Sequence, residues 1–219
     1  RIRVIQLEQQ WSTSQYGVSA RSYLERCAKR LREKELASLF YAAFELRNCV
    51  EARQAEYLEH YDPVKNKKIR PFKLGENAKK LAAIKKGDAI GKFEFILTDE
   101  ISFAGYHTPI PDRLKQICEK RLDSLRHAQI KFRDAKDSWW ANQRAILLEG
   151  YRLAWIACKG DIPMPPLWDR KTGKTHPVVF EQTPENEHFL DLVRGNIGRE
   201  FSLRVSYLDV HPDHWVPDL

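Results

Sequence analysis

Residues 36–61, with the sequence LASLFYAAFELRNCVEARQAEYLEHY, decide the fold of this chain. At about 100° per residue, most of their apolar side chains fall on one side of a helix. The stretch therefore predicts one long amphipathic helix with a wide apolar face. That face combines two adjoining rows, the first made of Leu39, Ala43, Leu46, Val50, Tyr57 and Tyr61 and the second of Phe40, Phe44 and Leu58.

Three polar residues, Arg47, Glu51 and Gln54, fall inside this apolar face instead of on the opposite side. A charge there is costly unless it is paired, and Arg47 and Glu51 stand four residues apart, where they can bind each other. The placement predicts a buried polar network that orders the core. The alternative is a functional site in which Arg47 contacts a phosphate in a cleft.

The composition limits the classes of protein to which the chain can belong. The 219 residues are 42% hydrophobic and 11% aromatic, which excludes a disordered protein and allows one core or one domain with an appendage. No run approaches the length of about 18 apolar residues that a membrane-spanning helix needs, so no membrane contact is expected. The four cysteines include no CxxC pair, which favours a reducing cytoplasm over a disulfide framework or a zinc site.

Periodicity and turn residues divide the rest of the chain into shorter elements. Helices are expected at about residues 19–33, 76–86, 112–158 (as two helices) and 185–193. Strands are expected at residues 2–7, 177–182 and 201–209, and residues 93–98 fit either a strand or a buried helix. Residues 160–177, which precede the last expected strands, are rich in proline and therefore predict an extended connection.

These elements predict a mainly α-helical protein, a helical bundle with a small mixed appendage at its C-terminal end. Residues 1–160 are expected to form the helical domain, together with an N-terminal strand and a basic linker at residues 64–86. Residues 161–219 are expected to form the appendage, which is rich in proline and tryptophan. A short β pairing between the N-terminal strand and residues 201–209 would connect the two parts.

The linker is the most basic part of the chain. Nine basic side chains and one acidic side chain give residues 64–86 a net charge of +8, whereas the whole chain carries +7. A local patch of this kind suits a phosphate backbone or another acidic surface. The predicted nucleic-acid contacts are Arg47 on the long helix and, in the linker, Lys65, Lys67, Lys68, Arg70, Lys73, Lys79 and Lys80.

Two short motifs resemble those of HEPN-type helical proteins. Residues 45–51, ELRNCVE, are similar to the ELR-x-x-(V/I)-E pattern of the second helix in that family. Residues 122–127, LDSLRH, match an L-x-x-L-x-H pattern found in a later helix. The resemblance covers about residues 20–135.

Many HEPN proteins are metal-independent ribonucleases of toxin and antiphage systems, and two copies usually face each other in a dimer. The resemblance implies an arginine that stabilises the charged phosphorane and, with four to six residues between them, a histidine that takes the 2′-hydroxyl proton. Arg53 and His60 have six residues between them and lie on nearly the same face of a straight helix, about 10 Å apart. The helical projection places both at the edge of the apolar face, where a solvent-facing site can form. Arg121 and His127 have five between them but lie about 240° apart unless the helix is broken.

The sequence thus predicts a cytoplasmic, HEPN-like protein that engages nucleic acid, RNA above all, and the resemblance implies a metal-independent ribonuclease of a toxin or antiphage defence system. A homodimer or a subunit of a defence complex is expected. The catalytic candidates are Arg53, His60, Arg121 and His127. No cofactor and no metal site are expected, since Pro212 makes a rigid turn inside the His-x-x-His motif near the C-terminal end. The alternative is a non-catalytic helical interaction module that docks to an acidic partner.

Overall fold

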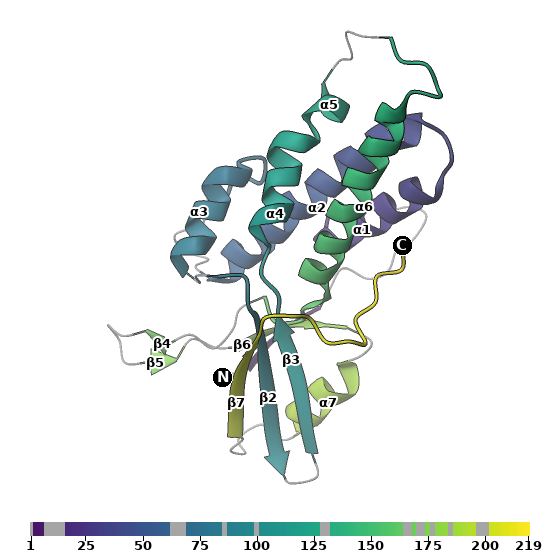
Figure 1. Ribbon diagram of the computed structural model, residues 1–219. Coiled ribbons are helices and arrows are strands. Elements are labelled where there is room, and N and C mark those ends of the chain that lie inside the picture. Colours follow the sequence, from purple (N-terminus) through teal and green to yellow (C-terminus); the bar gives the residue numbers. More distant parts are fainter. Residues whose placement is uncertain are drawn as a thin grey trace. The chain divides into compact units, whose positions relative to one another are not determined.

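The chain divides into two compact units. The sheet unit comprises Arg1–Gln10, Asp88–Pro109 and Lys159–Pro212, and the helical unit comprises Trp11–Gly87, Ile110–Cys158 and Asp213–Leu219. The protein is mainly α-helical with a smaller mixed part (Figure 1), which confirms the predicted fold class. The computed structural model describes residues 2–6, 16–61, 69–84, 87–98, 101–127, 132–163, 168–169, 174–175, 178–183, 186–195 and 202–219.

The helical unit is built on one long helix, α2 (Ala37–Tyr61), which is the helix predicted from residues 36–61. Helix α2 contacts the helix before it, the helix after it and a broken helical segment from later in the chain (Figure 1). The other elements are α1 (Ala20–Arg32), α3 (Leu74–Ile84), α4 (Asp112–Gln116), the π-helical turn η1 (Ile117–Arg121), α5 (Asp123–Arg126) and α6 (Ser138–Lys159).

Helix α1 begins at Ala20 because Ser19 caps it. The Ser19 hydroxyl oxygen accepts a hydrogen bond from the backbone N–H of Ser22 at 3.2 Å, which satisfies one of the N–H groups that lack a helical partner. The side of α1 that carries Leu24, Cys27 and Leu31 is buried in the same core as the first apolar row of α2. Burial of a leucine side chain contributes about 1.5–3 kcal/mol, so this shared core holds the two helices together.

The apolar face predicted for α2 is buried only in part. Its first row lies in the core through Leu39, Ala43, Leu46, Val50 and Tyr57. In the second row Leu58 is buried, but the Phe44 side chain is 59% exposed. The expectation that Phe44 belongs to the core is therefore wrong, because the core forms around the first row and the second row runs along its edge.

A π-helical turn interrupts the helix that begins at Asp112. A regular helix would place Arg121 in the same buried row as Leu114 and Cys118. The turn η1 has i→i+5 hydrogen bonding and so accommodates one extra residue. As a result Leu122 is fully buried in place of Arg121, and Arg121 is exposed.

The sheet unit contains a three-stranded antiparallel sheet in the order β3-β2-β7 and, separately, a parallel pair of β1 with β6. Its core is aromatic, with Phe95 and Phe180 fully buried at its centre. Gly105 permits this packing, because a Cβ atom there would lie 2.6 Å from Ile162 Cδ1 and 2.8 Å from Phe180 Cε1. The elements are β1 (Ile2–Gln6), β2 (Ile90–Thr98), β3 (Ile101–His107), β4 (Trp168–Asp169), β5 (Lys174–Thr175), β6 (Val178–Gln182), α7 (Glu187–Gly195) and β7 (Ser202–Leu208).

The strand pairing differs from the one that the sequence predicts. Strand β1 pairs in parallel with β6, with Val4 opposite Phe180, and β7 pairs with β2, with Val205 opposite Phe93. The expected pairing of the N-terminal strand with residues 201–209 is therefore wrong. The predicted division at residue 160 also misses the sheet residues 88–109, because strand pairing joins segments that are distant in the sequence and leaves no local signal.

The end of the chain belongs to the helical unit instead of the predicted appendage. The Tyr151 hydroxyl of α6 donates a hydrogen bond to the Asp218 carboxylate, and an Arg32 nitrogen lies 2.8 Å from the same carboxylate. The Tyr151 side chain is buried, and this burial together with the hydrogen bond to Asp218 raises the pKa of its hydroxyl. These contacts join the last residues of the chain to α1 and α6.

Candidate functional site

The Arg47–Glu51 pair forms the polar network predicted for α2. The Arg47 Nε atom lies 2.7 Å from Glu51 Oε1, and Arg47 Nη1 donates a 3.0 Å hydrogen bond to the Cys118 carbonyl in η1. Both side chains are more than four-fifths buried. Because Arg47 connects α2 to the π-helical turn, the network specifies how these two elements pack.

Burial of Glu51 has an electrostatic consequence. Loss of water raises the pKa of the Glu51 carboxyl above its ordinary value, and the nearby Arg47 guanidinium opposes this shift only in part. The arrangement is that of a structural ion pair, with Arg47 committed to a carboxylate and a carbonyl of its own chain. A phosphate at Arg47 would have to compete with both.

Gln54, the third polar residue of the apolar face, is fully buried. Neither its side-chain oxygen nor its side-chain nitrogen has a hydrogen-bond partner among the described residues. An unsatisfied buried amide costs about 1–3 kcal/mol, so Gln54 weakens the core that Arg47 and Glu51 order.

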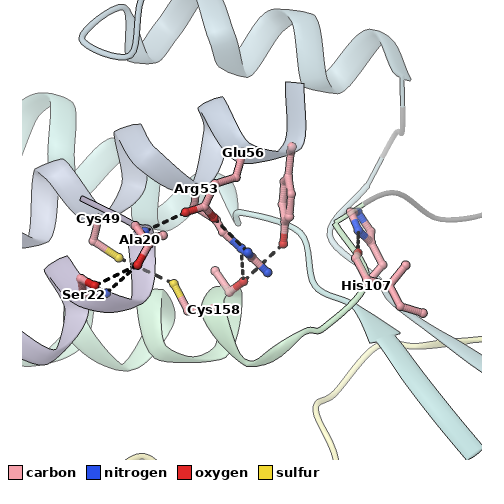
Figure 2. Close-up of polar contacts among 11 residues, drawn as sticks. Ala20, Ser22, Cys49, Arg53, Glu56, His107 and Cys158 are labelled. Carbon is pink, nitrogen blue, oxygen red and sulfur yellow. Dashed lines mark hydrogen bonds and ion pairs between the residues drawn. The ribbon is translucent and has the colours of Figure 1, made fainter. Parts of the chain in front are cut away.

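Arg53 is the largest fully buried side chain of the described residues, with 1% of its surface exposed. Its Nε donates a 3.1 Å hydrogen bond to the Ala157 carbonyl, and its Nη1 donates a 3.0 Å hydrogen bond to Glu56. Glu56 in turn accepts a 2.7 Å hydrogen bond from the Ala20 N–H at the start of α1 (Figure 2). The guanidinium also lies 4.5 Å from the centre of the Tyr57 ring.

The position of Ala157 explains why an arginine is buried here. Its carbonyl lies in the last turn of α6, where carbonyl groups lack helical partners and the helix dipole favours positive charge. The Tyr57 hydroxyl donates to the same carbonyl at 3.3 Å. Arg53 thus caps α6 from α2 and, through Glu56, holds the start of α1.

This geometry corrects the expected location of Arg53. The helical projection places Arg53 with His60 at the edge of the apolar face, open to solvent, and that location is wrong for Arg53 because the end of α6 covers it. His60 is half-buried. Since the Arg53 guanidinium is enclosed, the structure does not present Arg53 and His60 together to a substrate.

Arg121 and His127 are both exposed, and a break in the helix separates them. The helix ends its π-helical turn at Arg121, bends at Leu122 and continues as the short helix α5. The His127 side chain is 71% exposed, and its Nε2 atom lies 3.9 Å from the Asp123 carboxylate. On a straight helix these two side chains would point in different directions, so they can share a site only if the helix is broken between them. The structure has a break at Leu122, between η1 and α5.

Residues 69–84 of the basic linker are described, and this part carries exposed cations before and on α3. The side chains of Arg70, Lys79 and Lys80 are exposed, whereas Lys73 lies 3.2 Å from Glu76. Buried Asn77 donates a 3.0 Å hydrogen bond to the Arg70 carbonyl and so ties the turn before α3 to the helix. The other predicted contacts of the linker, Lys65, Lys67 and Lys68, lie outside the described residues.

The cysteines offer no reactive nucleophile. All four are buried and none forms a disulfide, although the sulfur atoms of Cys49 and Cys158 are 3.7 Å apart (Figure 2). Burial raises the pKa of the Cys118 thiol to about 12, which keeps it protonated at neutral pH. No group of three His, Cys, Asp or Glu side chains in the described residues has a geometry that could hold a metal ion.

A polar cluster in the sheet unit could not be found from the sequence. Asp161 accepts a hydrogen bond from the Tyr106 N–H at 2.8 Å and another from the Asn186 amide at 2.9 Å. Asn186, which is 1% exposed, also donates to the Glu181 carbonyl and accepts from the Thr183 N–H. Each of these groups lies far from Tyr106 in the sequence, and no motif connects them. These contacts join groups of the same unit, so the cluster supports the unit.

The exposed residues of the helical unit are therefore the candidates for function, in two groups: the cations around α3, and Arg121 with His127. None of the helices in the described residues is long and apolar enough to cross a membrane. Comparison with protein-family models, with curated proteins and with solved structures found no match for this chain.

Proposed function

We propose that this protein binds RNA through the exposed cations around α3. The observation that carries the proposal is the concentration of positive charge there: Arg70, Lys79 and Lys80 are exposed within a segment of net charge +8. Cations of this kind neutralise phosphates and release counterions, which drives binding to nucleic acids. The resemblance of residues 20–135 to HEPN-type proteins supports RNA as the partner.

The cations lie on a fixed support. Helix α3 contacts α2, and the Asn77 side chain bonds the turn that carries Arg70 to the helix that carries Lys79 and Lys80. A preformed arrangement of charges loses less entropy on binding than a flexible one. Phe72, in the same turn as Arg70, is 61% exposed and supplies a ring on which an unpaired base can stack.

The first prediction concerns the lysines of α3. Replacing both Lys79 and Lys80 with glutamine should weaken binding of a labelled single-stranded RNA by about tenfold, since each lysine lost removes one phosphate contact. The slope of log affinity against log salt should fall by about 1.4, or about 0.7 per contact. Fluorescence anisotropy across a salt series measures both quantities.

The matched control is the double variant Lys29→Gln with Lys136→Gln, which removes two exposed lysines of the helical unit that lie outside α3. It should bind RNA as the unchanged protein does. Equal loss in both double variants would mean that overall charge, and not the α3 surface, drives binding. Tighter binding to polyglutamate than to RNA would favour the alternative function, docking to an acidic protein.

RNA cleavage at Arg121 and His127 is the second candidate function, and the break between η1 and α5 is the observation that favours it. In this reaction His127 takes the proton of a ribose 2′-hydroxyl, whose oxygen attacks the adjacent phosphorus. The 5′-oxygen leaves and takes up a proton, which yields a 2′,3′-cyclic phosphate and a 5′-hydroxyl. Arg121 would stabilise the negative charge of the phosphorane. A cytoplasmic defence role is an extension of this proposal.

The second prediction tests cleavage. With excess EDTA present, the protein should cut RNA to products that end in a 2′,3′-cyclic phosphate, and His127→Gln should slow the cut by about 10²–10⁴-fold, the usual contribution of a general base. The matched control is His60→Gln, which should cut at the unchanged rate. Absence of cleavage by the unchanged protein, or loss of cleavage in His60→Gln alone, would contradict this assignment.

A further inference from the structure

Two of the four buried cysteines face each other inside the helical unit. Cys49 lies in α2 and Cys158 in the last turn of α6, and their sulfur atoms are 3.7 Å apart (Figure 2). The two residues are 109 positions apart in the sequence, so only the packing of α2 with α6 brings them together. Cys27 has a different partner, because its thiol donates a hydrogen bond to the Ala42 carbonyl at 3.5 Å.

Gly150 allows α6 to approach α2 closely enough for this contact. A Cβ atom at residue 150 would lie 2.7 Å from Leu46 Cδ2, which is too close for a side-chain carbon. Leu46 stands about one turn before Cys49 on α2, and Gly150 stands about two turns before Cys158 on α6. The bond between two sulfur atoms is about 2.05 Å long, so each sulfur would have to move by less than about 1 Å to form it.

The surroundings of the two thiols differ. The hydrogen bond from the Cys49 thiol lowers the pKa of the Cys158 thiol, burial opposes this shift, and the Arg53 guanidinium supports it. Arg53 is held there by its 3.1 Å hydrogen bond to the carbonyl of Ala157, the residue before Cys158. The hydrogen bond and burial raise the pKa of the Cys49 thiol instead. Cys158 is therefore the member of the pair that is suited to attack an oxidant.

Burial decides which oxidant can reach the pair. Cys49 is 1% exposed and Cys158 is 3% exposed, so neither thiol can act on a large substrate. Cys158 is the second-last residue of α6, and the end turns of helices open more readily than their middles. A molecule as small as hydrogen peroxide therefore has a route to Cys158 that a bulky reagent lacks.

We propose that Cys49 and Cys158 are a peroxide-sensitive thiol pair that closes to a reversible disulfide between α2 and α6. The Cys158 thiolate attacks one oxygen of the peroxide, the O–O bond breaks, and the departing hydroxide takes up the proton of the Cys158 thiol as water. The Cys49 sulfur then attacks the sulfenic acid formed on Cys158, and a second water leaves with the Cys49 proton. Two thiols are oxidised to one disulfide, and one peroxide is reduced to two waters.

The disulfide would close a long loop of the chain, since 109 positions separate its ends. A bond of this kind removes conformations from the unfolded chain, and a long loop loses more of them than a short one. The helical unit should therefore be more stable when oxidised than when reduced. The proposal goes beyond RNA binding and cleavage, since the pair includes none of the cations around α3 and neither Arg121 nor His127.

The third prediction is a disulfide between residues 49 and 158. The folded full-length chain, treated with a small excess of hydrogen peroxide and then blocked with N-ethylmaleimide in urea, should retain two of its four free thiols. Digestion should release one linked pair of peptides, which contain Cys49 and Cys158 and which dithiothreitol separates. Mass spectrometry of the intact chain and of its peptides measures both results.

Two double variants that retain two cysteines each provide the matched comparison. Cys27→Ala with Cys118→Ala keeps the proposed pair, so it should lose both thiols, and its melting temperature should rise by about 5 °C or more. Cys49→Ala with Cys158→Ala should lose its thiols at least about tenfold more slowly, because burial keeps both protonated and no partner sulfur stabilises a thiolate. Circular dichroism checks that both fold, and the peptide map of the unchanged chain decides the matter without either variant.

Three results would overturn the pair. One is an equal rate of thiol loss in the two double variants, which would mean that oxidation is unselective. Another is retention of all four thiols by the folded chain under conditions where the urea-unfolded chain loses them, which would mean that peroxide does not reach Cys158. The third is a lower melting temperature after oxidation, which would mean that the bond does not fit the packing of α2 with α6.

Discussion

Replacing Arg53 with methionine should lower the free energy of unfolding of the helical unit by about 3–5 kcal/mol, the range seen when one partner of a buried ion pair is removed. Methionine keeps much of the apolar stem but donates no hydrogen bond. The Ala157 carbonyl would lose its charged donor, and Glu56 would lose its cation. The change would therefore weaken the end of α6 and the joint between α1 and α2 at once.

Urea unfolding followed by far-ultraviolet circular dichroism measures the loss, and the melting temperature should fall by about 10 °C. Arg121→Met is the matched control, because it makes the same substitution at an exposed position of the same unit. A surface change of this kind should alter stability by less than about 0.5 kcal/mol. A loss below about 1 kcal/mol for Arg53→Met would contradict the structural role of Arg53, since a single net hydrogen bond is worth that much.

Replacing Asn186 with aspartate should destabilise the sheet unit by about 3 kcal/mol or more. The two side chains have the same shape, but aspartate cannot donate the hydrogen bonds that Asn186 gives to Asp161 and to the Glu181 carbonyl. A second carboxylate would instead stand about 3 Å from that of Asp161, in a site that is almost fully buried. The unpaired buried charge and the two lost hydrogen bonds both lower the free energy of unfolding of the sheet unit.

The near-ultraviolet circular dichroism of the aromatic core reports on the sheet unit, because Phe95 and Phe180 lie at its centre with their rings 5.1 Å apart. The loss should be smaller in acid, where a protonated aspartate at residue 186 can again donate to Asp161. Asn142→Asp is the control, since it makes the same change at an exposed position of α6. Equal stability of Asn186→Asp and Asn142→Asp would show that the cluster around Asp161 does not support the unit.

The helices of the chain follow from local patterns. Periodicity and capping residues predict α1, α2, α3 and α7 close to their observed bounds and α6 close to its observed end, because each helix bonds its own backbone and buries one face. The break at η1 has no such local signal. One additional residue in a turn moves Leu122 into the core and Arg121 out of it, and only packing against α2 decides which of them is buried.

Contacts with other helices determine the role of the polar residues on α2. The sequence places Arg47, Glu51 and Gln54 inside the apolar face, and the structure has all three largely buried. It also places Arg53 at the edge of that face, but a helical projection contains no information about α6, whose last turn encloses this side chain. Arg121 and His127, which are exposed, therefore replace Arg53 and His60 as the candidate catalytic pair.

By itself the sequence determined the mainly helical class, the long helix of residues 36–61, the buried Arg47–Glu51 pair and the local excess of positive charge. All four depend on the spacing of residues along a single segment. Only the tertiary structure decided the pairing of β1 with β6, the cluster around Asp161 and the burial of Arg53. Each of these depends on groups that are distant in the sequence and meet because apolar surfaces and unpaired backbone groups are removed from water together.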